Sequence, residues 1–237
     1  MPSIDISILA FLNTFAHRSG AVDHFIGLIA HTPLFKGGMA MALLWWGWFR
    51  GEGDHLQRRQ SILATLLGCM AALAVARALA LAVPFRLRPV HTSVLAFQLP
   101  YGASPETLIG WSSFPSDHAA LFAGLATGML WLSRGIGGVG LGYVLIVICL
   151  PRLYLGIHYP TDILSGVLIG MAVVALAQRP RIKLVITRPW LTWMRKSPGL
   201  FYACFFLFTY EMAVVFDDVR EIGRFLWDIL GAIIARL

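Results

Sequence analysis

Long apolar stretches are the feature that most constrains how this chain can fold. Residues 61–83 contain one charged side chain, Arg77, and residues 162–177 contain one, Asp162, at their first position. A helix needs about 17–25 predominantly apolar residues to cross the hydrocarbon core of a bilayer. Hydrophobic residues make up 58% of the chain and charged residues 13%, far from the composition of a soluble domain. We therefore expect an all-α membrane protein.

The apolar stretches predict a polytopic bundle of about six transmembrane helices. The expected spans are residues 37–49, 61–83, 116–132, 136–156, 162–177 and 200–216. Polar residues interrupt residues 4–34, which favours two short interfacial helices there. Residues 217–237 mix charges with apolar residues at helical spacing, which predicts an amphipathic C-terminal helix.

Composition and motifs divide the chain into two parts. We expect residues 1–178 to form the membrane core. Residues 179–237 would add a basic cytoplasmic loop, one more transmembrane helix and the amphipathic tail. The segment from residue 198 to 237 lies outside every motif described below, and it is expected to serve substrate access or oligomerisation.

The net charge of +7 does not indicate a nucleic-acid-binding protein, because no solvated basic domain carries it. Basic residues gather instead in the connections at 50–60, 134 and 179–196, which alternate spans place on one side. The positive-inside rule makes that side cytoplasmic. We therefore expect a multi-pass protein of the inner (cell) membrane, in contact with membrane lipids, whose opposite connections face the periplasm or exterior.

Three histidines, His17, His24 and His31, recur every seven residues near the N-terminus. This spacing is compatible with a metal-binding face, or with a polar stripe on interfacial helices. The helix-breaking pair Ser19-Gly20 favours the polar stripe.

Three polar clusters fall on the predicted outer side, in the stretches PFRLRP (84–89), FPSDH (114–118) and PRLYLGIHYPTD (151–162). Arg88 and Arg152 offer planar guanidinium groups that match phosphate oxygens. Ser116 is placed to cap a helix whose free backbone N–H groups favour an anion.

His158 and Asp162 form an H-x-x-x-D pattern. A carboxylate near one imidazole nitrogen leaves the other free to attack, and His118 is a second imidazole able to protonate a leaving oxygen. These groups predict phosphoryl transfer through a phosphohistidine. A divalent metal held by the two histidines and a carboxylate is the alternative, and the nearby arginines disfavour it. A transporter would instead carry its ionisable residues deep within the spans.

These residues resemble the tripartite signature of the type-2 phosphatidic acid phosphatase superfamily, KxxxxxxRP, PSGH and SRxxxxxHxxxD. The second block reads Pro115-Ser116-Asp117-His118, and the third runs from Pro151-Arg152 through His158 to Asp162. The first block is present only as Arg88-Pro89, with Leu81 at the position of its Lys.

The resemblance implies that His158 is the nucleophile, Asp162 orients it and His118 is the general acid. It implies that Ser116, Arg88 and Arg152 hold phosphate oxygens, and it involves no metal or cofactor. Asp117 stands where the signature has Gly, and as a member of the substrate-binding group its carboxylate is expected to cap the helix or to face a basic neighbour on the substrate. For the missing Lys we expect Arg86 to be a partial substitute; Arg77, one helical turn before Leu81, is the other candidate.

The stretches SFPSDH and YLGIHYPTD look most like the bacterial undecaprenyl-diphosphate phosphatases of this superfamily. That likeness implies removal of the terminal phosphate from a polyprenyl diphosphate at the outer face, in service of cell-wall biogenesis. The alternatives within the superfamily are a phosphatidylglycerophosphate, phosphatidate or lipid A phosphatase, and a lipid phosphotransferase.

Overall fold

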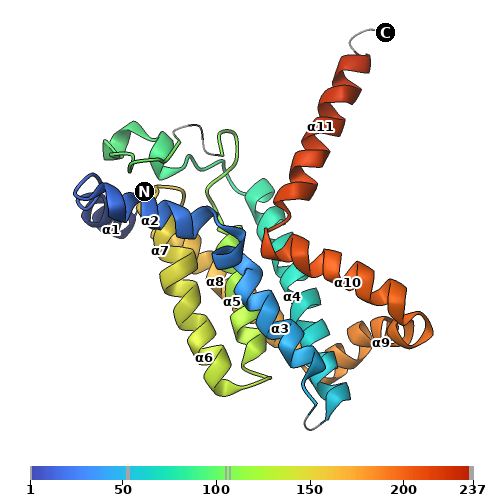
Figure 1. The fold of residues 1–237 in the computed structure, drawn as a ribbon. Helices are drawn as coiled ribbons and strands as arrows, with labels where there is room; N and C mark the ends of the chain where they lie inside the picture. Colours follow the sequence, from blue (N-terminus) through green and yellow to red (C-terminus); the bar gives the residue numbers. More distant parts are fainter. Residues whose placement is uncertain (1, 52–53, 105, 107, 235–237) are drawn as a thin grey trace.

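The structure, a computed structural model, describes residues 2–51, 54–104, 106 and 108–234. In these residues the regular elements are all helical, as predicted (Figure 1). Their bounds are α1 Ser3–Asn13, α2 Gly20–His31, η1 Leu34–Gly38, α3 Met39–Phe49, α4 His55–Ala82, η2 Pro89–His91, η3 Ser93–Leu95, α5 Asp117–Met129, α6 Arg134–Tyr143, η4 Val144–Cys149, α7 Leu150–Tyr154, α8 Pro160–Ala177, α9 Pro180–Lys196, α10 Pro198–Ala213 and α11 Asp217–Ile234.

Three helical stretches in the described residues are long and apolar enough to cross a membrane: α4, the continuous run α6–η4–α7, and α8. Two bent pairs, residues 20–49 and 198–227, bring the number to as many as five. Helix α5 has 13 residues, which span about 20 Å, less than the roughly 30 Å of a hydrocarbon core. The polytopic helical bundle is confirmed.

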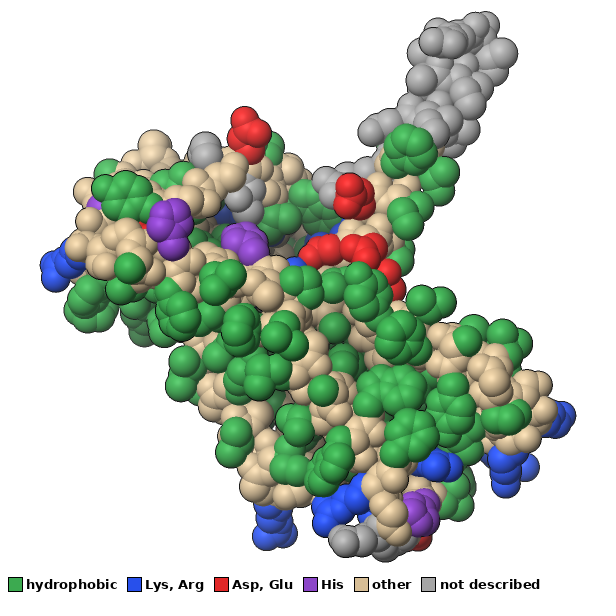
Figure 2. All heavy atoms as spheres, in the orientation of Figure 1, with side chains coloured by type: hydrophobic (Ala, Val, Ile, Leu, Met, Phe, Trp, Pro, Cys, Tyr) green, Lys and Arg blue, Asp and Glu red, His purple; other side chains and the backbone are tan. Residues whose placement is uncertain are grey.

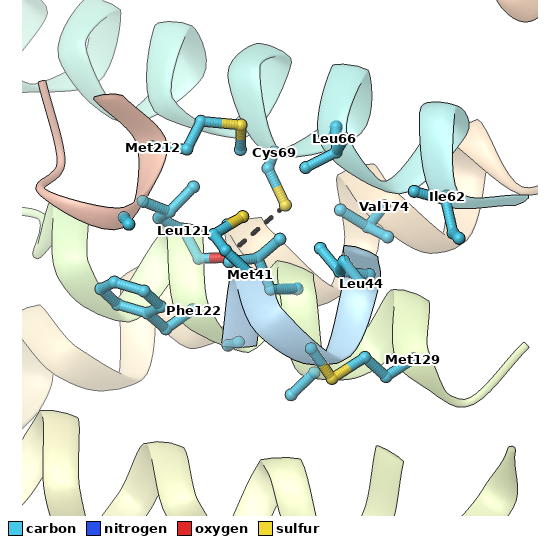
Figure 3. Packing of buried hydrophobic residues seen from close by; sticks show 14 of the residues in the cluster. Met41, Leu44, Ile62, Leu66, Cys69, Leu121, Phe122, Met129, Val174 and Met212 are labelled. Atoms are coloured by element: carbon cyan, nitrogen blue, oxygen red, sulfur yellow. Dashed lines mark hydrogen bonds between the residues drawn. The ribbon is translucent and has the colours of Figure 1, made fainter. Parts of the chain in front are cut away.

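Helix α5 is the centre of the bundle. Ala, Gly, Leu, Phe and Met dominate its sequence on all sides, and every residue except His118 is buried. A helix that is apolar all round is stable only when neighbours surround it. Around Cys69 the side chains of α3, α4, α5, α8 and α10 meet in one apolar core (Figure 3).

Glycines set how closely α8 approaches α5. A Cβ at Gly170 would lie 2.0 Å from the carbonyl oxygen of Ala120, and one at Gly166 would lie 2.4 Å from that of Ser116. Small residues four apart allow two helix backbones to touch in this way. The backbone N–H of Ser116 donates to the carbonyl of Asp162 at 3.1 Å, so the starts of α5 and α8 lie side by side.

One segment differs from its expected form, and another keeps it. The basic connection at 179–196, expected as a loop, is helix α9, because its apolar residues recur at helical spacing and Pro180 starts it. The N-terminal segment is two short helices as expected, and α1 and α2 lie beside the long connection between α4 and α5 (Figure 1). On the face shown in Figure 2, Lys and Arg side chains gather at the end of the bundle opposite α1 and α2.

Candidate active site

A cavity of about 170 Å³ opens where the starts of α5 and α11 and the turn before α8 meet the end of α2. Its lining includes Arg88, His118, Arg152 and His158, from all three motif blocks. Residues that are up to 70 positions apart in the sequence therefore converge here, as predicted from the ends of the spans.

His158 follows a sharp reversal of the chain after α7. Gly156 has a φ of +66°, and a Cβ there would lie 2.7 Å from the ring of Phe97. The reversal turns the backbone N–H of Ile157 toward the carbonyl of Arg152, at 2.9 Å. His158 and Arg152 are consequently brought to the same cavity although α7 ends between them.

The His158 ring is fixed through Nδ1. This nitrogen lies 2.8 Å from the carbonyl oxygen of Ser113, which can only accept, so Nδ1 carries the proton. Nε2 is then unprotonated, and its lone pair accepts a long contact from Nη1 of Arg88 at 3.5 Å. A neutral imidazole in this tautomer is a nucleophile.

Asp162 lies in the second layer around His158. Its Oδ2 is 3.8 Å from Nδ1 of His158, too far for a hydrogen bond. The same oxygen accepts from the Ser113 hydroxyl at 2.5 Å and from the backbone N–H of Tyr159 at 2.8 Å. Asp162 thus caps its own helix and holds the residue whose carbonyl orients the ring.

The two motif arginines are each 4% exposed and have a free N–H group. Arg88 donates through Nη1 to the carbonyl of Ile157 and through Nη2 to that of Ser112, while Nε has no partner. Arg152 donates through Nη2 to the carbonyl of Ala30, while Nη1 has no partner. Unpaired buried donors are costly, and an anion in the cavity satisfies them.

Ser116 and His118 stand at the start of α5. The Ser116 hydroxyl is the N-cap, because it accepts from the backbone N–H of Ala119 at 3.3 Å. The His118 ring lines the cavity, and in the described part of the chain no hydrogen-bond partner holds it. A ring without a structural partner is available for proton transfer.

Burial lowers the pKa of His158, and the charge of Arg88 lowers it further, against the opposing effect of Asp162. The ring is therefore neutral at pH 7, as a nucleophile requires. Burial also lowers the pKa of Arg88 to about 10, which leaves the guanidinium charged at neutral pH.

The comparison with known families agrees with this arrangement. A model of the PAP2 superfamily matches residues 61–183, more than half of the chain and all three motif blocks. The chain belongs to the PAP2 superfamily. The resemblance predicted from the motifs is confirmed, and membership of this superfamily supports a phosphatase activity.

The chain is also similar to a protein of Escherichia coli (strain K12) named "Putative undecaprenyl-diphosphatase YbjG". The two are 42% identical over 59 residues, which make up 25% of this chain and 30% of the relative. The matched region thus spans less than a third of that relative. No solved structure matches the chain.

The structure separates the two candidates for the missing Lys of the PAP2 signature. Leu81 is 89% exposed and does not line the cavity. Arg77 lines the cavity, where it forms an ion pair with Asp117 and lies over the ring of Trp111 at 4.9 Å. Asp117 was expected to cap the helix or to face a basic group of the substrate, and its carboxylate instead pairs with Arg77 of the same chain.

Arg86 does not line the cavity. Its Nη1 donates to Oδ1 of Asp162 at 2.5 Å, and its Nη2 donates to Oδ2 of Asp5 at 2.7 Å. Asp5 is fully buried and also accepts from Thr161. We therefore propose that Arg86 positions Asp162 behind the PAP2 site, in place of the phosphate contact expected from its nearness in sequence.

Sequence reasoning did not find several residues that shape this site, namely Asp5, Lys36, Ser113, Asp217 and Arg220. One signal was present: Lys36 is a single charge beside a predicted span, and such a residue is a functional candidate by default.

The three N-terminal histidines do not share one environment. His31 lines the cavity, whereas the His17 ring contacts the carbonyl of Leu99. The described residues contain no cluster of three or more His, Cys, Asp or Glu side chains suited to a metal ion.

Proposed function

We propose that this protein is a membrane lipid-phosphate phosphatase that works through a phosphohistidine on His158. The observation that carries the proposal is the pair of free donors, Arg88 Nε and Arg152 Nη1, beside the unprotonated Nε2 of His158. Free donors can bind the phosphate oxygens while the neutral imidazole attacks phosphorus, which is the arrangement that phosphoryl transfer requires.

In the first step, Nε2 of His158 forms a bond to phosphorus as the bond from phosphorus to the leaving oxygen breaks. The His118 ring gives a proton to that oxygen, and the negative charge of the substrate favours the protonated ring. Water then attacks the phosphohistidine and returns a proton to His118, which releases inorganic phosphate. Nδ1 of His158 keeps its hydrogen bond to the Ser113 carbonyl throughout.

For the substrate we propose undecaprenyl diphosphate, cleaved to the monophosphate. The partial similarity to the Escherichia coli relative supports this choice. Phosphatidylglycerophosphate, phosphatidate and lipid A phosphates also present a terminal phosphate monoester. Transfer of the phosphate from His158 to a lipid hydroxyl, in place of water, would use the same protein nucleophile. These alternatives are outcomes of the experiment below.

We further propose that the cavity faces the periplasm or exterior of the inner membrane. The cavity lies at the end of the bundle where α1 and α2 meet the long 83–116 connection, whereas α9 and the connection from α3 to α4 carry the basic residues. The positive-inside rule places such basic connections in the cytoplasm.

The test uses purified full-length protein on a panel of the four lipid phosphates, with inorganic phosphate release and phosphate transfer to an added lipid alcohol as readouts. We expect His158→Ala to lower kcat by about 10⁴-fold or more, because the nucleophile is lost. His55→Ala is the matched control, since His55 is exposed at the far end of α4.

Full activity of His158→Ala would refute the mechanism. Activity lost in EDTA and restored by a divalent ion would establish the metal reading instead. Faster hydrolysis of another lipid of the panel, or phosphate appearing on the alcohol, would replace undecaprenyl diphosphate hydrolysis as the function.

A further inference from the structure

Three charged side chains at the cavity come from outside the region that matches the superfamily model. Lys36 lies on η1, and Asp217 and Arg220 lie on the first turn of α11. Nζ of Lys36 donates to Oδ2 of Asp217 at 2.6 Å, and Nη2 of Arg220 lies 3.2 Å from Oδ1. The Asp217 carboxylate therefore bridges the Lys36 and Arg220 side chains at the cavity.

The three side chains differ in burial. The Lys36 side chain is 11% exposed, that of Arg220 is 28% exposed and that of Asp217 is 47% exposed. A buried cation is costly unless an anion accompanies it. Asp217 is the member with the most open route to solvent, so another anion is able to replace it without uncovering the cations.

The charge of the cavity exceeds what one phosphate needs. Five cationic side chains and two carboxylates line it, which leaves an excess of three positive charges with the histidines neutral. A terminal phosphate monoester carries about two negative charges, and the inner phosphate of a diphosphate adds about one more. Without the Asp217 carboxylate the excess would rise to four positive charges, enough to balance the roughly three negative charges of a diphosphate.

The backbone delivers Asp217 to the cavity through a sharp bend. Helices α10 and α11 meet at 91°, and Val215 and Phe216 in the bend have φ values of 58° and 56°. Branched and bulky residues rarely adopt this conformation, so packing must hold it, and Val215 is 2% exposed. The start of α11 is thus held at the cavity while its remainder projects away from the bundle (Figure 1).

We propose that Lys36 and Arg220 form a second phosphate subsite, which binds the inner phosphate of a diphosphate lipid after displacing the carboxylate of Asp217. The proposal rests on the proposed function, because it takes the terminal phosphate to lie between His158 and the two motif arginines. Asp217 then acts as an internal stand-in for the inner phosphate. It keeps the two cations paired when the cavity is empty.

The experiment measures equilibrium binding of farnesyl diphosphate and farnesyl monophosphate to the full-length protein in detergent, and separately their hydrolysis. Lys36→Met should lower the preference for diphosphate over monophosphate by about tenfold, because one charge-assisted contact is lost. Arg220→Gln should lower it in the same direction. Asp217→Asn should tighten diphosphate binding by about threefold or more, since no carboxylate competes.

Two further variants separate the subsite from a structural role. Lys36→Arg keeps the charge and should retain most of the preference, whereas Lys196→Met, an exposed lysine at the end of α9, should not change it. Equal weakening of both ligands in Lys36→Met, or weaker diphosphate binding in Asp217→Asn, overturns the proposal. If the wild-type protein binds diphosphate preferentially but releases no phosphate, the proposed function fails while the subsite stands.

Discussion

The two walls of the cavity are built in opposite ways. The wall from the superfamily region carries His158, Arg88 and Arg152, each about 4% exposed and held by backbone carbonyls. The wall from η1 and α11 carries Lys36, Asp217 and Arg220, which are joined by ion pairs nearer the solvent, and of these Arg220 also donates to the carbonyls of Val215 and Phe216. Side chains fixed by the main chain keep their positions as charge moves, which suits chemistry. Ion pairs exchange partners readily, which suits selection of what binds.

The largest effect that tests this contrast is on the chemical step. His118→Ala should lower kcat by about 10²–10⁴-fold, as expected for loss of a general acid. Arg220→Gln, on the other wall, should change kcat by less than about tenfold and act mainly on KM. Steady-state kinetics on farnesyl diphosphate measures both. A larger kcat loss in Arg220→Gln than in His118→Ala would erase the distinction between the walls.

The wall that carries His158, Arg88 and Arg152, here called the fixed wall, depends on the contact between α5 and α8. Gly170→Ala places a methyl group 2.0 Å from the carbonyl oxygen of Ala120, so the helices must separate. We expect a loss of about 3 kcal/mol or more in the free energy of unfolding. Gly138→Ala is the matched control, because no atom lies within 4 Å of its added Cβ. Thermal unfolding in detergent measures both, and equal melting temperatures would contradict the packing.

Asp5 tests whether the fixed wall extends to the N-terminal helix. Asp5→Asn removes the buried charge that Arg86 shares with Asp162, and it should cost about 3 kcal/mol of stability and about tenfold in kcat. Asp54→Asn is the control, because Asn also caps a helix and Asp54 caps α4 at the other end of the bundle. An unchanged kcat in Asp5→Asn would confine the role of α1 to folding.

The smallest effect is on the pH dependence of stability. Burial lowers the pKa of His158 in the folded protein, so the unfolded chain binds the proton more tightly. The contribution of the neutral ring is complete above the unfolded pKa of about 6.5 and is lost as the pH falls from there toward the folded pKa. His158→Ala should therefore flatten the melting temperature between about pH 6.5 and 5. A steeper profile in the variant would contradict the lowered pKa.

The helical architecture followed from local pattern. The apolar stretch at 162–177 begins at Asp162 and follows Pro160, two residue types that favour a helix start, and α8 spans Pro160–Ala177. The stretch at 61–83 lies within α4. The charges of residues 179–196 predict a loop, but the apolar residues among them recur at helical spacing and the segment folds as α9.

The candidate site was predictable only in part. The positions of the motifs at the ends of neighbouring spans predicted that His118, Arg152 and His158 lie close together, and all three line one cavity. Arg86 was expected to contact phosphate, yet it lies among Asp5, Thr161 and Asp162, since a partner on α1 is invisible to spacing along the chain. The role of Ser113 could not be predicted, because the atom that orients His158 is its backbone carbonyl, which every residue has.

The sequence by itself determined that this chain is a helical membrane protein of the PAP2 superfamily, since hydropathy and motif spacing are properties of contiguous residues. Only the tertiary structure decided which cations share the cavity and which carboxylates neutralise them. Arg77, Lys36 and Arg220 meet there from α4, η1 and α11. Electrostatic pairing depends on distance in space, which the packing of α5 against α8 and the bend at Val215 set.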